Sequence, residues 1–149
     1  MENAPFTIET VSWSKARKEL LDVRTAVFVH EQGVPQEMEE DEFDEISVHF
    51  LARDAHGKPI GTARLLPDGK VGRVAVLAPL RRKRVGQALM MQVVKAWREK
   101  EGSTSPLSLH AQVSSIPFYE SLGFSCIGPE FLEAGIPHRK MSLSDRAGE

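Results

Sequence analysis

The stretch that decides the fold is LAPLRRKRVGQALM, which runs from Leu77 to Met90. Four consecutive cations, at residues 81–84, are followed by Val85 and Gly86 and then by apolar residues at helical spacing. The segment before them, residues 70–77, has the composition of a strand. The sequence therefore predicts a strand, a basic turn and a helix, in that order.

The predicted helix spans residues 85–100 and carries its apolar side chains on one face. The first N–H groups of a helix have no intrahelical partner, and its N-terminus carries partial positive charge. A strand-to-helix turn can direct these groups at an anion, and arginine binds phosphate oxygens in pairs. The pattern favours a pyrophosphate cradle. A solvated basic turn and a polyanion-binding patch are the alternatives.

Short connections join the other predicted elements. Helices are predicted from about residue 13 to residue 27, capped by Ser12, and from residue 114 or 115 to 122. The remaining strands are predicted at residues 6–10, 46–53, 59–66, 107–111, 124–127 and 138–143, with a loop around Gly128-Pro129 and Gly135 between the last two. This order predicts an α/β (α+β) fold, a mixed sheet with helices on both faces.

Length and composition exclude several classes of protein. A chain of 149 residues predicts one domain, residues 1–149. The single cysteine, Cys126, rules out an internal disulfide and favours a cytoplasmic location. A net charge of -2 argues against a general nucleic-acid binder. No apolar run is long enough for a membrane span or a signal peptide. The five scattered histidines have no metal-ligand spacing, so no metal site is predicted.

An acidic run, EMEEDEFDE, occupies residues 37–45. One interpretation is a solvated loop with a helical turn, which is the usual meaning of such a run. The other is a surface that attracts a cationic amine. The run weakly favours amines over acidic molecules as substrates.

Two segments together resemble the GCN5-related N-acetyltransferase (GNAT) family. In that family an R/Q-x-x-G-x-G/A turn binds the pyrophosphate of coenzyme A. The segment RVAVLAPLRRKRVGQALM, residues 73–90, places Arg81 and Gly86 at the first and last motif positions. It departs from the pattern at Arg84, which replaces the first glycine.

The second segment is IPFYESLGF, residues 116–124, which matches the family ending Y-x-x-x-G-F. Gln112 stands seven residues before Tyr119, where the family commonly has asparagine. The segments FVHEQGVP (residues 28–35) and LHAQ (residues 109–112) are similar to a bacterial subgroup of small single-domain members. The resemblance implies the family's mostly antiparallel sheet of about six or seven strands, and a homodimer is compatible with it.

The resemblance implies a donor, acetyl-CoA, as co-substrate, and direct transfer of its acetyl group to a primary amine of a small molecule or peptide. It also implies a cofactor-binding set that holds the pantetheine along a strand and the pyrophosphate at the turn. That set is Val74, Ala75, Val76, Arg81, Arg82, Lys83, Arg84, Val85, Gly86, Gln87, Gln112 and Phe118.

Three residues are candidates for proton transfer. Tyr119 is predicted to be the general acid, because a phenol with a pKa of about 10 can protonate a departing thiolate. Glu31 and His110 are both candidates for the general base, directly or through water, and histidine has a suitable pKa. The alternative for Tyr119 and for His110 is a structural role in the core.

Other functions on the same scaffold stay open. One is transfer of a longer acyl group from acyl-CoA or an acyl carrier, since FVHEQ also faintly resembles acyl-homoserine lactone synthases. Another is a regulatory protein that binds CoA without catalysis. A third is a nucleic-acid binder that uses residues 81–84, against which the overall acidic balance argues.

Overall fold

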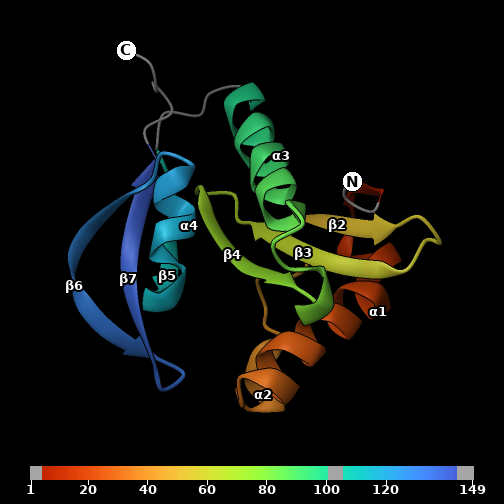
Figure 1. The fold of residues 1–149 in the computed structure, drawn as a ribbon, viewed down its shortest axis with the longest axis horizontal. Coiled ribbons are helices and arrows are strands. Elements are labelled where there is room, and N and C mark those ends of the chain that lie inside the picture. The colour runs from red at the N-terminus through yellow and green to blue at the C-terminus, as the bar shows by residue number, and fades with distance from the viewer. Residues whose placement is uncertain (1–4, 101–105, 144–149) are drawn as a thin grey trace.

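The computed structural model describes residues 5–100 and 106–143 and shows a seven-stranded sheet in the order β1-β2-β3-β4-β5-β7-β6 (Figure 1). The strands are β1 (Phe6–Val11), β2 (Val48–Asp54), β3 (Pro59–Leu65), β4 (Lys70–Val76), β5 (Leu107–Gln112), β6 (Ser125–Glu133) and β7 (Ile136–Leu143). Neighbouring strands are antiparallel except for β4 and β5, which are parallel. The predicted mixed, mostly antiparallel sheet is confirmed. The predicted single domain also includes residues 1–4, 101–105 and 144–149, which lie outside the described residues.

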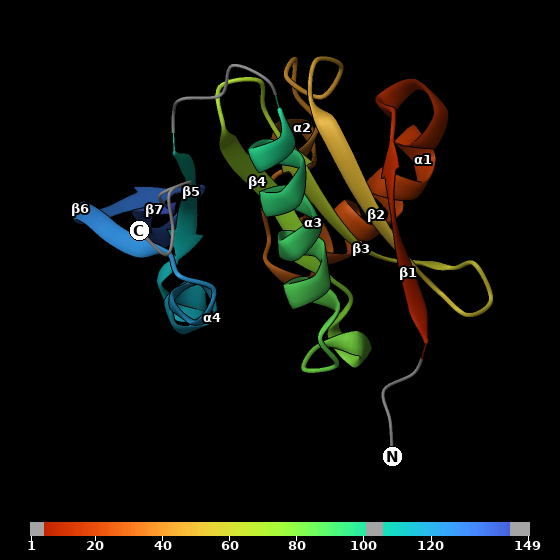
Figure 2. The same cartoon turned by 90° about the horizontal axis from the view of Figure 1, so that it is seen from above.

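Helices cover both faces of the sheet, as predicted (Figure 2). In β2, Phe50 and Ala52 belong to the core beneath α3, whereas Leu51 packs on the opposite face against α1. The helical elements are α1 (Trp13–Arg24), a π-helix η1 (Thr25–Glu31), α2 (Gln36–Glu39), η2 (Ala78–Leu80), α3 (Val85–Glu99), η3 (Val113–Ser115) and α4 (Ile116–Ser121). Among the described residues, no helix has the length and apolar character needed to cross a membrane.

The first helix follows its predicted apolar face but changes its winding. Ser12 caps α1 by accepting a hydrogen bond from the Lys15 N–H. The helix then continues as the wider η1, where the sequence predicts one regular helix. Such π-helical turns are frequent at functional sites. The apolar residues of this stretch that recur at helical spacing are all buried: Trp13, Ala16, Leu20, Val23 and Val27.

The sheet opens between β4 and β5. Their last paired residues are Val71 and Leu109, near the start of both strands. In β4, Arg73 and Val74 together oppose the single residue Ala63 of β3, so β4 carries a bulge at this point, and Arg73 has a φ of 50°. A bulge bends its strand, so the carboxyl-terminal half of β4 leaves β5 and a space between them is created for the site.

The prediction for the second strand is wrong in its details. The strand predicted from residue 46 begins at Val48, and Ile46 is 59% exposed. Burial in β2 is not confined to alternate side chains, because Leu51 is buried between Phe50 and Ala52. Helices cover both faces of this central strand, so no face is left polar.

The loop predicted around Gly128 and Pro129 is instead part of β6, which continues to Glu133. The strand accommodates the extra residues as a bulge between Ile127 and Phe131. A short turn at residues 134–135 then leads into β7. Glycine and proline mark a strand irregularity here rather than a strand end.

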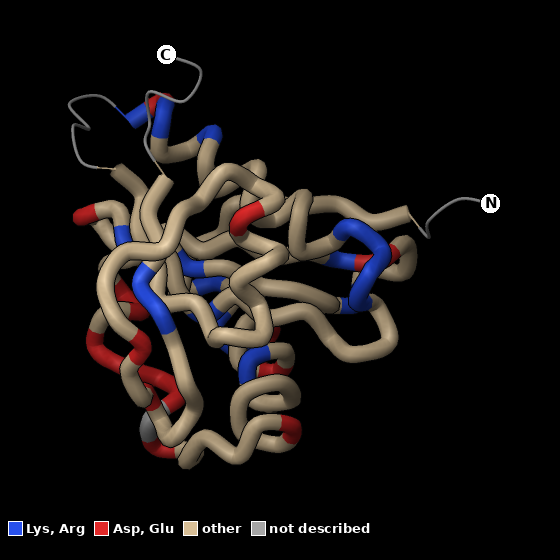
Figure 3. Tube along the Cα trace, turned by 60° about the vertical axis from the view of Figure 1, so that its left-hand side comes forward, with Lys and Arg blue, Asp and Glu red and all other residues tan. Residues whose placement is uncertain are grey.

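The acidic segment, whose Asp and Glu residues are red in Figure 3, is not a solvated loop throughout. That interpretation is wrong for Glu39 and Asp44, which are buried. The fully buried Arg24 contacts both carboxylates, and its Nη1 lies 2.9 Å from Asp44 Oδ1. Arg64 pairs with Asp44 and with Asp41. These ion pairs neutralise much of the charge that would otherwise attract a cationic amine.

The residue before α3, Arg84, has a φ of 70°, in the left-handed region. A residue with a Cβ is less stable there than glycine by about 1 kcal/mol. We expect Arg84→Gly to raise the free energy of unfolding by about 0.5–1 kcal/mol, measured by urea denaturation. Lys83→Gly removes the same charge from the same turn, at a residue without positive φ. An equal gain in both variants would contradict the prediction.

Candidate functional site

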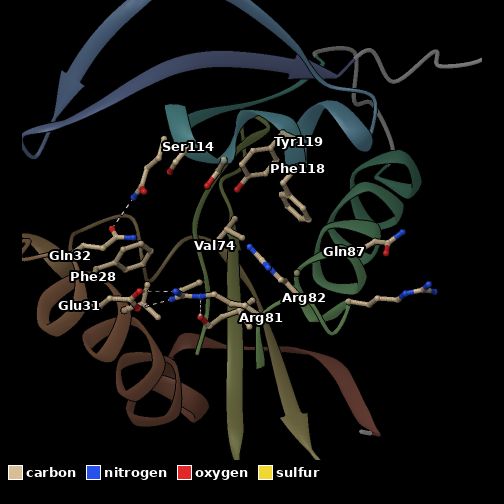
Figure 4. A pocket seen from close by; sticks show the side chains of 17 residues that line it. Phe28, Glu31, Gln32, Val74, Arg81, Arg82, Gln87, Ser114, Phe118 and Tyr119 are labelled. Atoms are coloured by element: carbon tan, nitrogen blue, oxygen red, sulfur yellow. Dashed lines mark hydrogen bonds and ion pairs between the residues drawn. The ribbon is translucent and has the colours of Figure 1, made fainter. Parts of the chain in front are cut away.

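A cavity of about 640 Å³ lies where β4 and β5 diverge (Figure 4). Its walls come from the ends of β4 and β5, the basic turn, the start of α3, η1 and α4. The structure brings to this cavity the whole predicted cofactor-binding set except Lys83 and Val85. Val85 is buried in the core, with 1% of its surface exposed.

The basic turn forms one end of the cavity. Its four cationic side chains are exposed, and in Figure 4 the Arg82 side chain reaches into the cavity. Gly86 stands in the first turn of α3, where a Cβ would lie 3.4 Å from Phe118 Cζ. Because Gly86 has no side chain, the first turn of α3 lies close to the Phe118 ring in the wall of the cavity. This arrangement of N–H groups and cations is suited to an anion such as a diphosphate.

Arg81 has protein partners in this structure. Its two terminal nitrogens each lie 2.7 Å from an oxygen of Glu31, and its Nε donates to the Val76 carbonyl at 2.8 Å. The hydrogen bonds from Arg81 lower the pKa of the Glu31 carboxyl. A lowered pKa makes a carboxylate a weaker base, so this geometry disfavours Glu31 as the general base. The ion pair instead fastens η1 to the basic turn.

A second cavity, of about 540 Å³, lies on the other side of the opening, between β4, β5 and the β6–β7 turn. Gln112 Nε2 donates to Gln32 Oε1 at 2.8 Å, which ties the end of β5 to the residue after η1. Reactants held in separate cavities would meet where the two join. The residues that line both cavities are Phe28, Gln32, Val74, Gln112 and Tyr119.

Tyr119 occupies this junction. Its ring is held edge-to-face by Phe118 and Phe124, at centroid distances of 5.0 and 5.9 Å. Its hydroxyl makes no hydrogen bond within residues 5–100 and 106–143, and Figure 4 shows it pointing into the cavity. Burial raises the pKa of the phenol above its ordinary value. The group therefore stays protonated at neutral pH and has a proton to donate.

The other predicted base, His110, lines the second cavity only. Its Nδ1 lies 2.8 Å from Glu133 Oε1. The sequence interpretation missed Glu133, because it assigned that position to a loop. The sequence does carry a signal for a strand here, because the apolar pair Phe131-Leu132 is followed by the polar Glu133 just before the turn residue Gly135. In the described part of the chain, no group of three or more potential metal ligands is gathered.

Comparisons with known proteins agree with this geometry. Residues 11–144 match the family described as "Acetyltransferase (GNAT) domain". The "Uncharacterized N-acetyltransferase YjcF" of Bacillus subtilis is 40% identical over 128 residues, which cover 83% of this chain and 89% of that protein.

Solved structures share the fold at lower identity. The crystal structure of Escherichia coli ElaA has a TM-score of 0.82 and 29% identity, covering 94% of this chain and 100% of that chain. An acyl-CoA N-acyltransferase from Pseudomonas aeruginosa has a TM-score of 0.79 and 28% identity, with the same coverage. The opened sheet, the basic turn before α3 and the family match lead to one conclusion: the chain belongs to the GNAT acetyltransferase family.

Proposed function

We propose that the protein transfers an acetyl group from acetyl-CoA directly to a primary amine of a small molecule or peptide. The observation that carries the proposal is the position of Tyr119, a protonated phenol at the junction of two cavities. One cavity ends at a basic turn suited to a diphosphate, and the other is separate from that turn. This is the arrangement expected for a donor and an acceptor that react in a ternary complex.

The first cavity would hold the donor. The pyrophosphate would bind at the N-terminus of α3, with Arg82 and Arg84 supplying charge. The pantetheine would extend along the edge of β4 near Val74, where pairing with β5 has ended. The thioester would then reach the junction beside Tyr119, with Phe118 forming part of the wall.

The second cavity would hold the acceptor, whose neutral nitrogen attacks the thioester carbonyl. The C–S bond then breaks, and the Tyr119 hydroxyl gives its proton to the departing thiolate. The proton lost by the nitrogen restores the phenol through solvent. No covalent enzyme intermediate is needed, because both reactants reach the same junction.

Gly86→Trp is expected to weaken acetyl-CoA binding at least tenfold in isothermal titration, because the indole would enter the first cavity past Phe118. Gly86→Ala is the control, since its Cβ would meet its nearest neighbour at an ordinary 3.4 Å. Equal binding by wild type, Gly86→Ala and Gly86→Trp would contradict the donor site.

Release of free thiol in the presence of spermidine, phenethylamine and a lysine-containing peptide tests the transfer itself. We expect at least one of these amines to accelerate thiol release and to yield the acetylated amine, identified by mass spectrometry. Tight binding of acetyl-CoA without transfer to any amine would instead support a CoA-binding regulatory protein.

A further inference from the structure

A carboxylate and an imidazole meet in the wall of the second cavity. His110 Nδ1 lies 2.8 Å from Glu133 Oε1. An ionised carboxylate only accepts hydrogen bonds, so the ring donates from Nδ1. A neutral imidazole then carries its lone pair on Nε2. Within the described residues Nε2 makes no hydrogen bond, and His110 is one of the residues that line the second cavity.

A tight hairpin places Glu133. Glu133 is the last residue of β6 and pairs with Ile136, the first residue of β7. The two residues between them both have positive φ, 53° and 78°, as in the two-residue turns that match strand twist. Because this turn is short and paired, the carboxylate is attached to a defined part of the sheet.

An aromatic ring restricts the imidazole. The bulge in β6 brings Phe131 beside His110, with ring centroids 4.9 Å apart in an edge-to-face contact. Phe131 also stacks on His138 at 5.9 Å. The His110 ring is therefore held on one side by packing and at Nδ1 by a carboxylate, and only 28% of its side chain is exposed.

We propose that Glu133 positions His110 as the general base that deprotonates the acceptor amine, an inference that rests on the transfer activity proposed above. The acceptor ammonium gives one proton to His110 Nε2 and becomes a nucleophile. As the C–N bond forms and the C–S bond breaks, Tyr119 protonates the thiolate. The second proton from the nitrogen restores Tyr119, and the imidazolium releases its proton to solvent.

The carboxylate of Glu133 has two effects on the ring. It fixes the tautomer that leaves Nε2 unprotonated, and its negative charge stabilises the imidazolium that forms. Loss of Glu133 leaves the other ionisable groups around the cavity in place, although it also removes the carboxylate oxygen that lies 4.0 Å from His138 Nε2. These groups are His138 and Lys140 on β7, Tyr119 on α4, Arg64 on β3, Lys70 and Arg73 on β4, and the acids Glu39, Asp41 and Asp68.

The tautomer can be tested without activity. In ¹⁵N-labelled protein saturated with CoA, long-range ¹H–¹⁵N spectra report which ring nitrogen carries the proton. We expect Nδ1–H for His110 in the wild type and Nε2–H in Glu133→Ala, with the signal assigned from His110→Ala. Glu130→Ala removes an exposed acid from the same strand and is expected to leave the wild-type tautomer. A wild-type ring protonated at Nε2 would overturn the proposal.

A double-mutant cycle tests the catalytic role, with spermidine, phenethylamine and the lysine-containing peptide as acceptors. We expect His110→Ala to lower kcat about 100-fold and Glu133→Ala about 10- to 100-fold. The double variant should be no slower than His110→Ala, because Glu133 acts only through that ring. Losses that multiply would show an independent effect of Glu133 and overturn the inference.

The activity assays distinguish a failure of the proposed acetyl transfer from a failure of the proposed role of Glu133. If the wild type transfers acetyl to none of these amines, the proposed function fails and the base role fails with it. If transfer occurs but the losses multiply, the proposed function stands and the role of Glu133 alone is refuted.

Discussion

Tyr119→Phe is expected to lower the single-turnover rate of thiol release about 100-fold or more while leaving the dissociation constant for acetyl-CoA unchanged. Only the hydroxyl is removed, and the edge-to-face contacts of the ring with Phe118 and Phe124 remain. We therefore expect the fold and the first cavity to be preserved in this variant. A thiolate that leaves without a proton donor must take its proton from water, so the loss should fall on the chemical step.

The pH profile adds an independent readout. Burial raises the pKa of Tyr119 above the ordinary value of about 10. The donor therefore keeps its proton throughout the neutral range, and its ionisation should produce no decline in kcat on the alkaline side below about pH 10.

Ser114→Ala is the matched control for Tyr119→Phe, since it also removes a hydroxyl from the wall of the first cavity. We expect its single-turnover rate to stay near the wild-type value. A Tyr119→Phe variant with wild-type turnover would refute the general acid and assign Tyr119 to packing alone.

Local patterns predicted most of the fold. Residues that lie a few positions apart in the sequence predict the apolar face of α1 and the turn before α3. They also predict the consecutive antiparallel strands β2, β3 and β4. The winding of η1 could not be predicted in this way, because the buried apolar residues of α1 and η1, from Trp13 to Val27, keep ordinary helical spacing. The first cavity could also be predicted from the sequence, since its basic end is one continuous strand-turn-helix segment with a family motif.

The contact between Glu133 and His110 depends on pairing between strands that are distant in the sequence, so local patterns did not predict it. Glu133 reaches His110 only because β6 continues through a bulge and pairs with β7, and nothing within residues 128–133 specifies that partner. The burial of Glu39 and Asp44 was also hard to predict, because an acidic run has the same sequence whether its carboxylates face solvent or pair with buried arginines. Arg24 carried a signal, since it follows Leu20 by four residues on the buried face of α1.

Arg24→Met is expected to lower the free energy of unfolding by about 3–5 kcal/mol, measured by urea denaturation at pH 7. The guanidinium is fully buried and donates to Asp44 at 2.9 and 3.2 Å and to the Glu39 carbonyl at 2.7 Å. Methionine preserves much of the volume, so the loss should come mainly from charge. Two carboxylates would remain buried without their main partner, which is far less favourable than an intact pair.

Arg17→Met is the matched control on the same helix. Arg17 also forms a two-pronged pair with a glutamate, Glu40, at 2.9 Å, and it also lies over the Trp13 ring. Its side chain is 55% exposed, however, so water screens the pair and replaces its hydrogen bonds. We expect little change in stability, and equal losses in the two variants would contradict the argument from burial.

Unfolding measured at acidic pH is a second test of the buried contact between Arg24 and Asp44. Burial opposes ionisation of Asp44, but hydrogen bonds from Arg24, from the Asp41 N–H and from Arg64 outweigh it and hold its pKa below the ordinary value. The folded pKa is the lower one, so this stabilisation is present above the unfolded pKa of about 3.9 and is lost as the pH falls through the folded value. In Arg24→Met the main partner is gone, and protonation of the buried Asp44 carboxylate should relieve the penalty. The stability difference between wild type and variant should therefore shrink below about pH 4. A difference that stays constant from pH 7 to pH 3 would mean that Arg24 stabilises the fold by packing rather than by charge.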